Sequence, residues 1–181
     1  CKSALAEAEV EYQDKESISI DALFVVSDSM SFMEKASINL NNQEVDIAIP
    51  IWTTTPWTLP ANEAVVLGSA IKYSLIEATL NNNSIYLLIA DDLIDSVCDR
   101  YDLQQWKILG EIDPNQIKGA LLKHPFYDKQ VPLLIGDYVT TDSGTGAVHT
   151  APAHGHDDFM MGKKFGLPLE SPVNEYGVYE E

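Results

Sequence analysis

Residues 52–62 hold four hydroxyl side chains, those of Thr53, Thr54, Thr55 and Thr58, in the run Trp-Thr-Thr-Thr-Pro-Trp-Thr-Leu-Pro-Ala-Asn. A hydroxyl both donates and accepts hydrogen bonds, so this run can hold a carbonyl, a sugar hydroxyl and a water together without placing a net charge beside them. The structural alternative is that threonine is here only a good strand residue, at a strand end or sheet edge set by the two prolines.

Residues 144–158 form a second segment with chemical potential, because three of the four histidines of the chain lie there. The segment opens with Gly144, Thr145 and Gly146, whose small size lets a backbone approach a ligand closely. It ends with Asp157 and Asp158, which we place in the first turn of a helix, where free amide groups favour an ionised carboxylate. Such a carboxylate could anchor an ammonium group.

A metal site is the main alternative for the second segment, since His149, His154, His156 and Asp158 are all metal-ligand types. The spacing does not support it, because the chain has neither a His-Glu-x-x-His helix nor closely spaced cysteines. Catalysis by Asp157 and Asp158 as a carboxylate pair is disfavoured, since neighbours on a helix point about 100° apart. We therefore predict no metal ligand, and a metal-dependent hydrolase stays the alternative.

The hydrophobic pattern predicts a β-rich α/β domain that positions these segments. Strands are expected at residues 18–26, 45–52, 106–112 and 131–135, and a hairpin joins residues 73–80 and 84–90 through the Asn-rich turn 81–83. A helix is expected over residues 91–101. A second helix begins at Asp157 with acidic residues and ends with Lys163, Lys164 and the stop residue Gly166, and a loop-like tail follows.

Composition limits the classes of function. The 181 residues suit one compact domain, 1–181, and the net charge of −17 argues against a free-standing nucleic-acid binder. Arg100 is the only arginine, and Lys163-Lys164, with Lys118, Lys123 and Lys129, offers at most a small basic patch, so any RNA must be held mainly elsewhere. Two cysteines, no signal peptide and no apolar run near the ~20 residues of a membrane span indicate a cytoplasmic protein. Because the chain begins without Met, we expect a piece of a larger protein.

The two segments together resemble the editing insertion of class I aminoacyl-tRNA synthetases for branched aliphatic amino acids. Valyl and leucyl members typically read Thr-Thr-Arg-Pro, an acidic residue and Thr, whereas Thr55, Pro56 and Trp57 give the isoleucyl form. Residues 144–158 match the same family, and residues 3–12 resemble its entry peptide. The likeness spans nearly the whole chain, although residues 67–128 carry little of it. It implies a compact editing domain with a β-barrel-like core of mixed strands and a few short helices.

The resemblance also implies roles for single residues. Asp158 would bind the α-ammonium of a misplaced amino acid, Thr53, Thr54 and Thr55 would line the hydrolytic pocket, and His149 would form the wall that excludes the cognate side chain. A general base is the alternative role for His149, because an imidazole titrates near neutral pH. Trp57 and Asn62 belong to the same motif, as a packing residue and a residue that orients the threonines. The expected substrate-contacting set is completed by Thr58, Gly144, Thr145 and Gly146. His154 and His156 are expected to be structural or solvated.

The expected activity is therefore hydrolysis of valine from mischarged isoleucine tRNA, with valyl-adenylate as a further candidate substrate. The expected partners are the 3′ end of that tRNA, its valine moiety and the remainder of the synthetase, and the domain is expected to be monomeric with no membrane contact. The signatures His-Ile-Gly-His and Lys-Met-Ser-Lys-Ser are missing, so this chain should neither use ATP nor need another cofactor. The competing hypotheses are an editing domain of the valyl or leucyl type and an inactive structural insertion.

Overall fold

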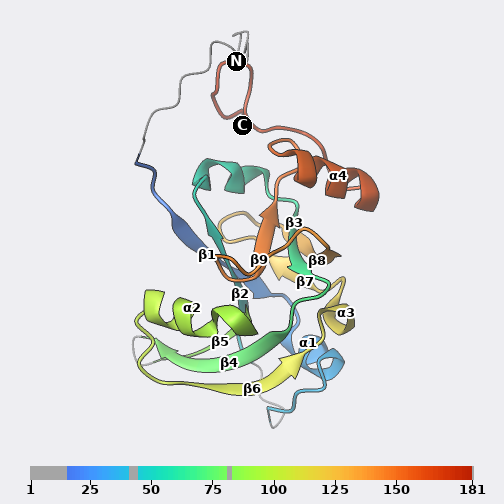
Figure 1. Ribbon diagram of the computed structural model, residues 1–181. Helices are drawn as coiled ribbons and strands as arrows, with labels where there is room; N and C mark the ends of the chain where they lie inside the picture. The colour runs from blue at the N-terminus through green and yellow to red at the C-terminus, as the bar shows by residue number, and fades with distance from the viewer. Residues whose placement is uncertain (1–15, 41–44, 81–82, 181) are drawn as a thin grey trace.

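The computed structural model describes residues 16–40, 45–80 and 83–180 (Figure 1). The predicted entry peptide, residues 3–12, and part of the predicted turn at 81–83 lie outside these ranges. The described residues contain nine strands: β1 (Ile20–Val26), β2 (Ile47–Thr53), β3 (Ala64–Gly68), β4 (Tyr73–Leu80), β5 (Asn83–Ala90), β6 (Trp106–Ile112), β7 (Leu121–Lys123), β8 (Gln130–Gly136) and β9 (Ala147–Thr150).

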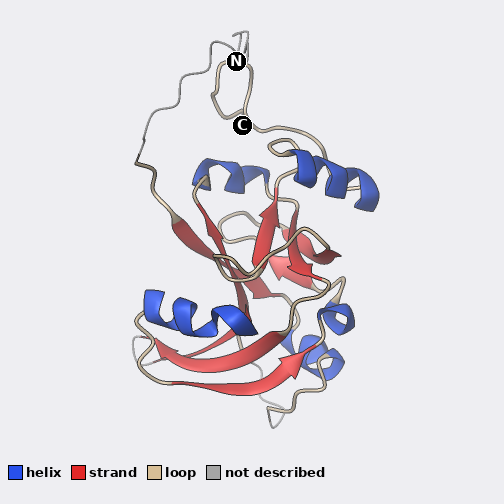
Figure 2. Ribbon diagram, in the orientation of Figure 1, coloured by secondary structure: helices blue, strands red, loops and turns tan. Residues whose placement is uncertain are grey.

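The strands form one mixed sheet in the order β6-β4-β5-β2-β1-β7-β8-β3-β9. Most neighbours are antiparallel, while β2 with β5 and β3 with β8 are parallel. Figure 2 shows the strands as two groups, with β4, β5 and β6 at one end and β3, β8 and β9 toward the other. The β-rich mixed fold is confirmed. Since β6 and β9 end the row, the barrel-like core is looser than a closed barrel.

Short helices connect and cover the strands: α1 (Ser29–Lys35), the 3-10 turn η2 (Pro56–Ala61), the 3-10 turn η3 (Asp91–Leu93), α2 (Ile94–Arg100), α3 (Pro114–Ile117) and α4 (His156–Phe165). Asp28 caps α1 by accepting a hydrogen bond of 2.9 Å from the amide of Ser31. Helix α4 begins with acidic residues, ends with lysines and stops at Gly166, whose φ of 68° is left-handed. The predicted second helix is thus confirmed, one residue earlier at its start.

Local patterns predicted the regular elements well. The hairpin β4–β5 pairs over its full length, from Tyr73 with Ala90 to Leu80 with Asn83. The helix expected over residues 91–101 is present as η3 followed by α2, because its first turn is wound more tightly. Strands β3, β7 and β9 and helix α1 were not predicted. They are short, and most of their stabilisation comes from neighbours distant in sequence.

The main hydrophobic core lies between the sheet and its covering helices. Fully buried side chains such as Phe24, Ile49, Leu75 and Leu88 come from the central strands. A smaller cluster with Val66, Leu134, Val139 and Met161 at its centre packs α4 against β3 and β8. This second cluster fixes α4 beside strand β9, and so it brings the two chemically interesting segments to one end of the molecule (Figure 1).

No helix among the described residues is both long enough and apolar enough to cross a membrane.

Candidate functional site

The threonine loop, residues 53–58, begins where strand β2 leaves the sheet. Thr53 is the last residue of β2, is buried and pairs with Ile20 of β1. Its hydroxyl accepts a hydrogen bond of 3.0 Å from the amide of Thr55 and lies 3.3 Å from the Thr55 hydroxyl. This local turn ends the strand and leaves Thr54 and Thr55 exposed at the surface. Two of the three predicted pocket threonines therefore face solvent.

A chain of hydrogen bonds connects the two predicted segments. The Thr58 hydroxyl donates to the Thr55 carbonyl at 2.9 Å, and it lies 3.1 Å from Nε2 of His149. Because the single hydroxyl hydrogen of Thr58 is used by Thr55, His149 must donate from Nε2. Nδ1 of His149 is then an acceptor, and Nδ2 of Asn62 lies 3.5 Å from it. The contacts thus fix one neutral tautomer of His149 and occupy both ring nitrogens.

Burial keeps His149 neutral. Its removal from water lowers the pKa of the imidazole to about 4, and the nearby His124 and His154 contribute to the same shift. A base with both nitrogens engaged and so low a pKa is a weak acceptor for a proton from water. The geometry favours His149 as a rigid wall over His149 as a general base.

The side chain of Asn62 connects His149 to the sheet. This side chain is fully buried, and Nδ2 also donates to the Ala64 carbonyl at 2.9 Å. Strand β3 starts at Ala64 and pairs with β9, where Val65 lies opposite His149. The orienting role that the sequence predicted for Asn62 therefore has a concrete form, in which one amide group binds both the backbone of β3 and the imidazole.

Asp158 lies in the first turn of α4, partly buried against the end of β9. Burial raises the pKa of its carboxyl to about 6, opposed by a backbone hydrogen bond from Ala151. A side chain at Gly155 would collide with it, because a Cβ there would lie only 2.5 Å from Oδ2 of Asp158. Gly155 thus leaves room for the carboxylate to fold back toward Ala151, two residues beyond His149.

Trp57 covers the same region from the threonine loop. Its ring packs edge-on against His154 with ring centroids 5.2 Å apart, and half of the side chain is exposed. Its backbone carbonyl accepts a hydrogen bond of 2.5 Å from the hydroxyl of Tyr179. In a 3-10 turn this carbonyl would bond to the amide of Pro60, which has no hydrogen to donate. Tyr179 supplies the missing donor.

The residues Gly144, Thr145 and Gly146 make structural contacts. The Thr145 hydroxyl is buried and donates to the Pro50 carbonyl at 2.6 Å. Gly144 and Gly146 have φ of 84° and 81°, and a Cβ on Gly146 would collide with the side chain of Ala90. These contacts tie the loop to β2 and β5, and the predicted contact of the three residues with substrate stays a prediction.

Two supporting residues were not identified from the sequence. The buried His124 holds the 3-10 turn η2, since its Nε2 lies 3.0 Å from the Leu59 carbonyl and its Nδ1 accepts from the amide of Tyr127 at 3.2 Å. Tyr73 donates to the Gly146 carbonyl and accepts from the amide of Gly68. The only feature of the sequence that could have pointed to His124 is that it is the one histidine outside the second segment. No feature of the sequence distinguished Tyr73 from the other tyrosines.

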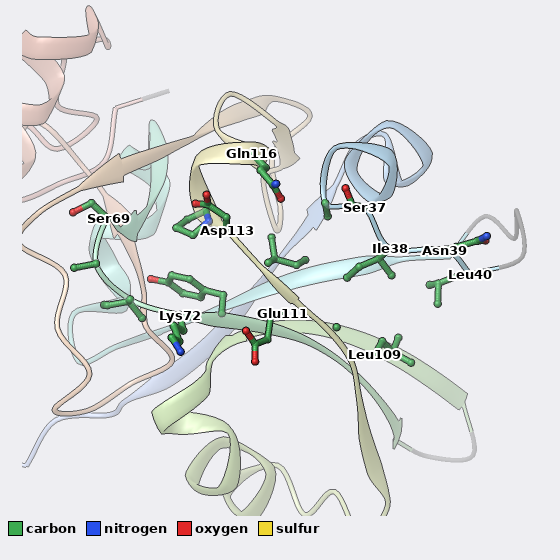
Figure 3. Close-up of a pocket in the computed structure, with 17 residues that line it drawn as sticks. Ser37, Ile38, Asn39, Leu40, Ser69, Lys72, Leu109, Glu111, Asp113 and Gln116 are labelled. Carbon is green, nitrogen blue, oxygen red and sulfur yellow. The ribbon is translucent and has the colours of Figure 1, made fainter.

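A large cavity lies elsewhere. It has a volume of about 740 Å³ and is lined by residues of 36–40, 69–73 and 109–116, including Ser37, Lys72, Glu111 and Gln116 (Figure 3). None of the site residues predicted from the sequence lines it. Among the described residues no three His, Cys, Asp or Glu side chains converge as metal ligands, so the geometry does not favour the metal-dependent hydrolase.

The fold defines a class of protein. It resembles the editing domain of the cytosolic leucyl-tRNA synthetase of P. falciparum, with a TM-score of 0.67 and 12% identity over 88% of this chain and 75% of that one. The P. knowlesi counterpart gives a TM-score of 0.65 and 12% identity over 83% of this chain and 64% of the other. These likenesses show the fold of a synthetase editing domain.

The family follows from the sequence comparison. Residues 33–178 match the family model described as the leucyl-tRNA synthetase editing domain, and the chain belongs to this family. The chain is similar to curated isoleucine–tRNA ligases. It is 44% identical over 179 residues to that of Coxiella burnetii, 46% over 180 to that of Shewanella pealeana and 47% over 182 to that of Pseudoalteromonas atlantica. These alignments cover 99–100% of the chain and 19% of each relative. The chain therefore spans about a fifth of the relatives it matches.

Proposed function

We propose that this chain is the editing domain of an isoleucyl-tRNA synthetase and hydrolyses valine from mischarged isoleucine tRNA in the cytoplasm. The observation that carries the proposal is the hydrogen-bonded assembly of Thr55, Thr58, His149 and Asn62, together with a carboxylate, Asp158, that is held by Ala151, two residues beyond His149. The family membership and the isoleucine–tRNA ligase relatives support the same function.

In this proposal the exposed Thr54 and Thr55 hydroxyls, with Thr53 behind them, contact the ester and the terminal ribose. Asp158 binds the α-ammonium of the amino acid, which requires its ionised form. His149, fixed by Thr58 and Asn62, forms the wall against which a larger side chain collides. Trp57 shapes the rim of the site.

The chemistry requires little acid–base power from the protein. An aminoacyl ester is already activated, so orienting one water against the carbonyl and stabilising the developing oxyanion are sufficient. Since both nitrogens of His149 are engaged, the water is oriented by threonine hydroxyls, backbone groups or the free ribose hydroxyl. Asp158 bound to an ammonium ion is a poor base for the same water. No ATP or other cofactor is required for this step.

A hydrolytic site of this kind is needed because binding alone distinguishes isoleucine from valine only weakly. One methylene in an apolar pocket contributes only about 1–3 kcal/mol, and isoleucine against valine is the familiar worked case of that limit. A second pocket that is too small for isoleucine but admits valine selects in the opposite sense. The rigid wall at His149 suits such a steric sieve better than a mobile side chain would.

The test is a deacylation assay with valyl-tRNA and isoleucyl-tRNA, each on isoleucine tRNA, run with and without EDTA. We expect hydrolysis of the valyl ester only, unchanged by EDTA. Loss of activity with EDTA would favour the metal-dependent hydrolase. Preference for another aminoacyl-tRNA would favour a valyl- or leucyl-type domain, and no hydrolysis at any tRNA concentration would indicate a structural insertion.

A further inference from the structure

Arg100, the last residue of helix α2, binds two other segments of the chain at once. Its guanidinium donates to both carboxylate oxygens of Asp21 in β1, from Nε at 3.0 Å and from Nη2 at 2.9 Å. Nη2 also donates to the carbonyl of Gly144 at 3.3 Å, the first residue of the glycine loop, residues 144–146. The hydroxyl of Tyr101 donates to Asp21 as well, at 2.7 Å. We call these four residues the arginine clamp.

The arginine clamp has one defined geometry. Two parallel donors on a single carboxylate fix the orientation of a guanidinium, which one lysine contact would not do. The side chains of Arg100 and Asp21 are only 32% and 18% exposed, so water competes for the pair only in part. Burial and the hydrogen bond to Asp21 raise the pKa of Tyr101, so its hydroxyl remains a donor. The carbonyl of Gly144 is therefore bound by a side chain whose position is fixed.

On one side, the arginine clamp lies next to the start of the threonine loop. Asp21 pairs with Trp52 in the β1–β2 ladder, and the neighbouring pair is Ile20 with Thr53. Gly144 lies against the same position, since a Cβ on Gly144 would be 3.7 Å from the Cβ of Trp52. The arginine clamp thus joins β1 to the glycine loop one residue before Thr53, where the threonine loop leaves the sheet.

On the other side, the arginine clamp leads to strand β9, which carries His149. The glycine loop continues directly into β9. Its second residue, Thr145, is anchored to β2 through the carbonyl of Pro50, and its first residue, Gly144, is held by Arg100. The chain therefore enters β9 from a loop that is bound to β2 on one side and to β1 and α2 on the other.

We propose that Arg100 is a positioning residue for the hydrolysis, because it sets the place of His149 relative to the threonine loop by tying the glycine loop to β1. This inference rests on the proposed function. Arg100 acts through Gly144 and Asp21 and does not touch the reacting groups. A role in stability alone would need only the ion pair with Asp21 and would leave the bond to the Gly144 carbonyl without a function.

The test compares Arg100→Met with Lys107→Met in the full chain. Each substitution removes one cation that contacts a carboxylate and keeps a long side chain. Lys107 contacts Glu77 at 2.7 Å in β6, which ends the row of strands opposite to β9. Arg100→Lys keeps the charge, but one ammonium group cannot reproduce the planar fork that binds Asp21 and Gly144 together.

Three quantities are measured for each variant. Deacylation of valyl-tRNA gives kcat and KM separately, and isoleucyl-tRNA gives the ratio of the two rates. Amide hydrogen exchange is followed in residues 144–149. Urea unfolding gives the stability, and the kinetic assays are run under conditions in which every variant is folded.

We expect Arg100→Met to lower kcat for valyl-tRNA roughly tenfold with little change in KM. A misplacement of about 1 Å can cost about 100-fold in rate, and the loss is smaller here because Thr145 still anchors the loop to β2. Exchange in residues 144–149 becomes faster, and the ratio of valyl to isoleucyl hydrolysis falls because the wall at His149 is less well fixed. Arg100→Lys lies between Arg100→Met and the unaltered chain, and Lys107→Met matches the unaltered chain in kcat, ratio and exchange.

An unchanged kcat in folded Arg100→Met would overturn the inference, whatever the loss of stability. A lower kcat without faster exchange in residues 144–149 would also overturn it, because the bond to Gly144 would then not transmit the effect. If Arg100→Met does not fold, Arg100→Lys, which keeps the ion pair, serves for the same comparison. Inactivity of the unaltered chain on valyl-tRNA would instead overturn the proposed function, and the exchange data would still decide whether Arg100 holds the glycine loop.

Discussion

Nε2 of His149 lies 3.1 Å from the hydroxyl of Thr58, a residue 91 positions earlier in the chain. Since that hydroxyl already donates to the Thr55 carbonyl, the contact fixes the imidazole as a hydrogen-bond donor at Nε2. The same bond joins the threonine loop to strand β9. Mutations on either side of it should therefore change the shape of the site as well as its stability.

Replacing Thr58 by valine should destabilise the domain and loosen His149. The substitution removes a buried hydroxyl that serves two partners, which costs about 1–3 kcal/mol in the free energy of unfolding. Urea unfolding measures the loss, and a valyl-tRNA deacylation assay measures the effect on the site. Thr58→Ser keeps the hydroxyl and should retain most of both. Equal behaviour of the valine and serine variants would show that the hydroxyl is not the element that matters.

Enlarging the pocket at His149 should relax the discrimination between amino acids. His149→Ala leaves space beside the threonine loop, so isoleucyl-tRNA becomes a substrate, whereas the unaltered domain leaves it intact. Thr55→Ala tests the same sieve from the opposite segment. The measurement is the ratio of the two deacylation rates, valyl to isoleucyl. An unchanged ratio in both variants would count against the steric sieve.

Asp158 should control the pH dependence of hydrolysis. Its pKa is raised to about 6, and only the ionised form binds an ammonium group, so kcat/KM should fall as the pH drops below about 6. The pKa of His149 is about 4, so we expect this histidine to cause no further change in kcat/KM near neutral pH. Asp158→Asn should lose about 10- to 100-fold in kcat/KM at pH 7, as expected for losing one charged hydrogen bond. If kcat/KM of the Asp158→Asn variant still fell below about pH 6 as it does in the unaltered domain, the pH dependence would belong to another group.

The same carboxylate should lower stability at neutral pH. Because its pKa is higher in the folded than in the unfolded chain, the folded state binds more protons, and stability declines as the pH rises from about 4 through 6. Asp158→Asn keeps an oxygen for the Ala151 amide without the buried charge. It should raise the free energy of unfolding at pH 7 by about 1 kcal/mol after allowance for partial exposure. Lower stability at pH 7 would contradict the assignment of burial as the cause.

Tyr179→Phe should loosen the threonine loop without changing its sequence. The hydroxyl of Tyr179 supplies the donor that Pro60 cannot, so its removal leaves the Trp57 carbonyl without this partner. We expect faster amide hydrogen exchange in residues 57–62 and a several-fold lower kcat/KM for valyl-tRNA. Tyr86→Phe, which removes a hydroxyl bonded to Glu77 in the distant hairpin, is the matched control. Identical exchange in the two variants would leave Tyr179 without a role in the loop.

The strands and the hairpin β4–β5 could be predicted from the sequence because their signals are local. Alternation and β-branched residues define β1, β6 and β8, and the Asn-rich segment separates two paired strands. Strands β3 and β9 could not be predicted in this way. They have five and four residues, and they form a sheet only because Val65 and His149 meet across a long stretch of chain.

The sequence by itself determined which chemistry the chain carries. Hydroxyls gather in residues 53–58 and imidazoles with a carboxylate gather in residues 149–158, and such clusters are visible in one dimension because residue type and spacing define them. Only the tertiary structure decided how they work together. The tautomer of His149, the raised pKa of Asp158 and the hold of Tyr179 on Trp57 depend on burial and on contacts between distant positions. Those quantities are properties of packed neighbours, and local sequence does not encode them.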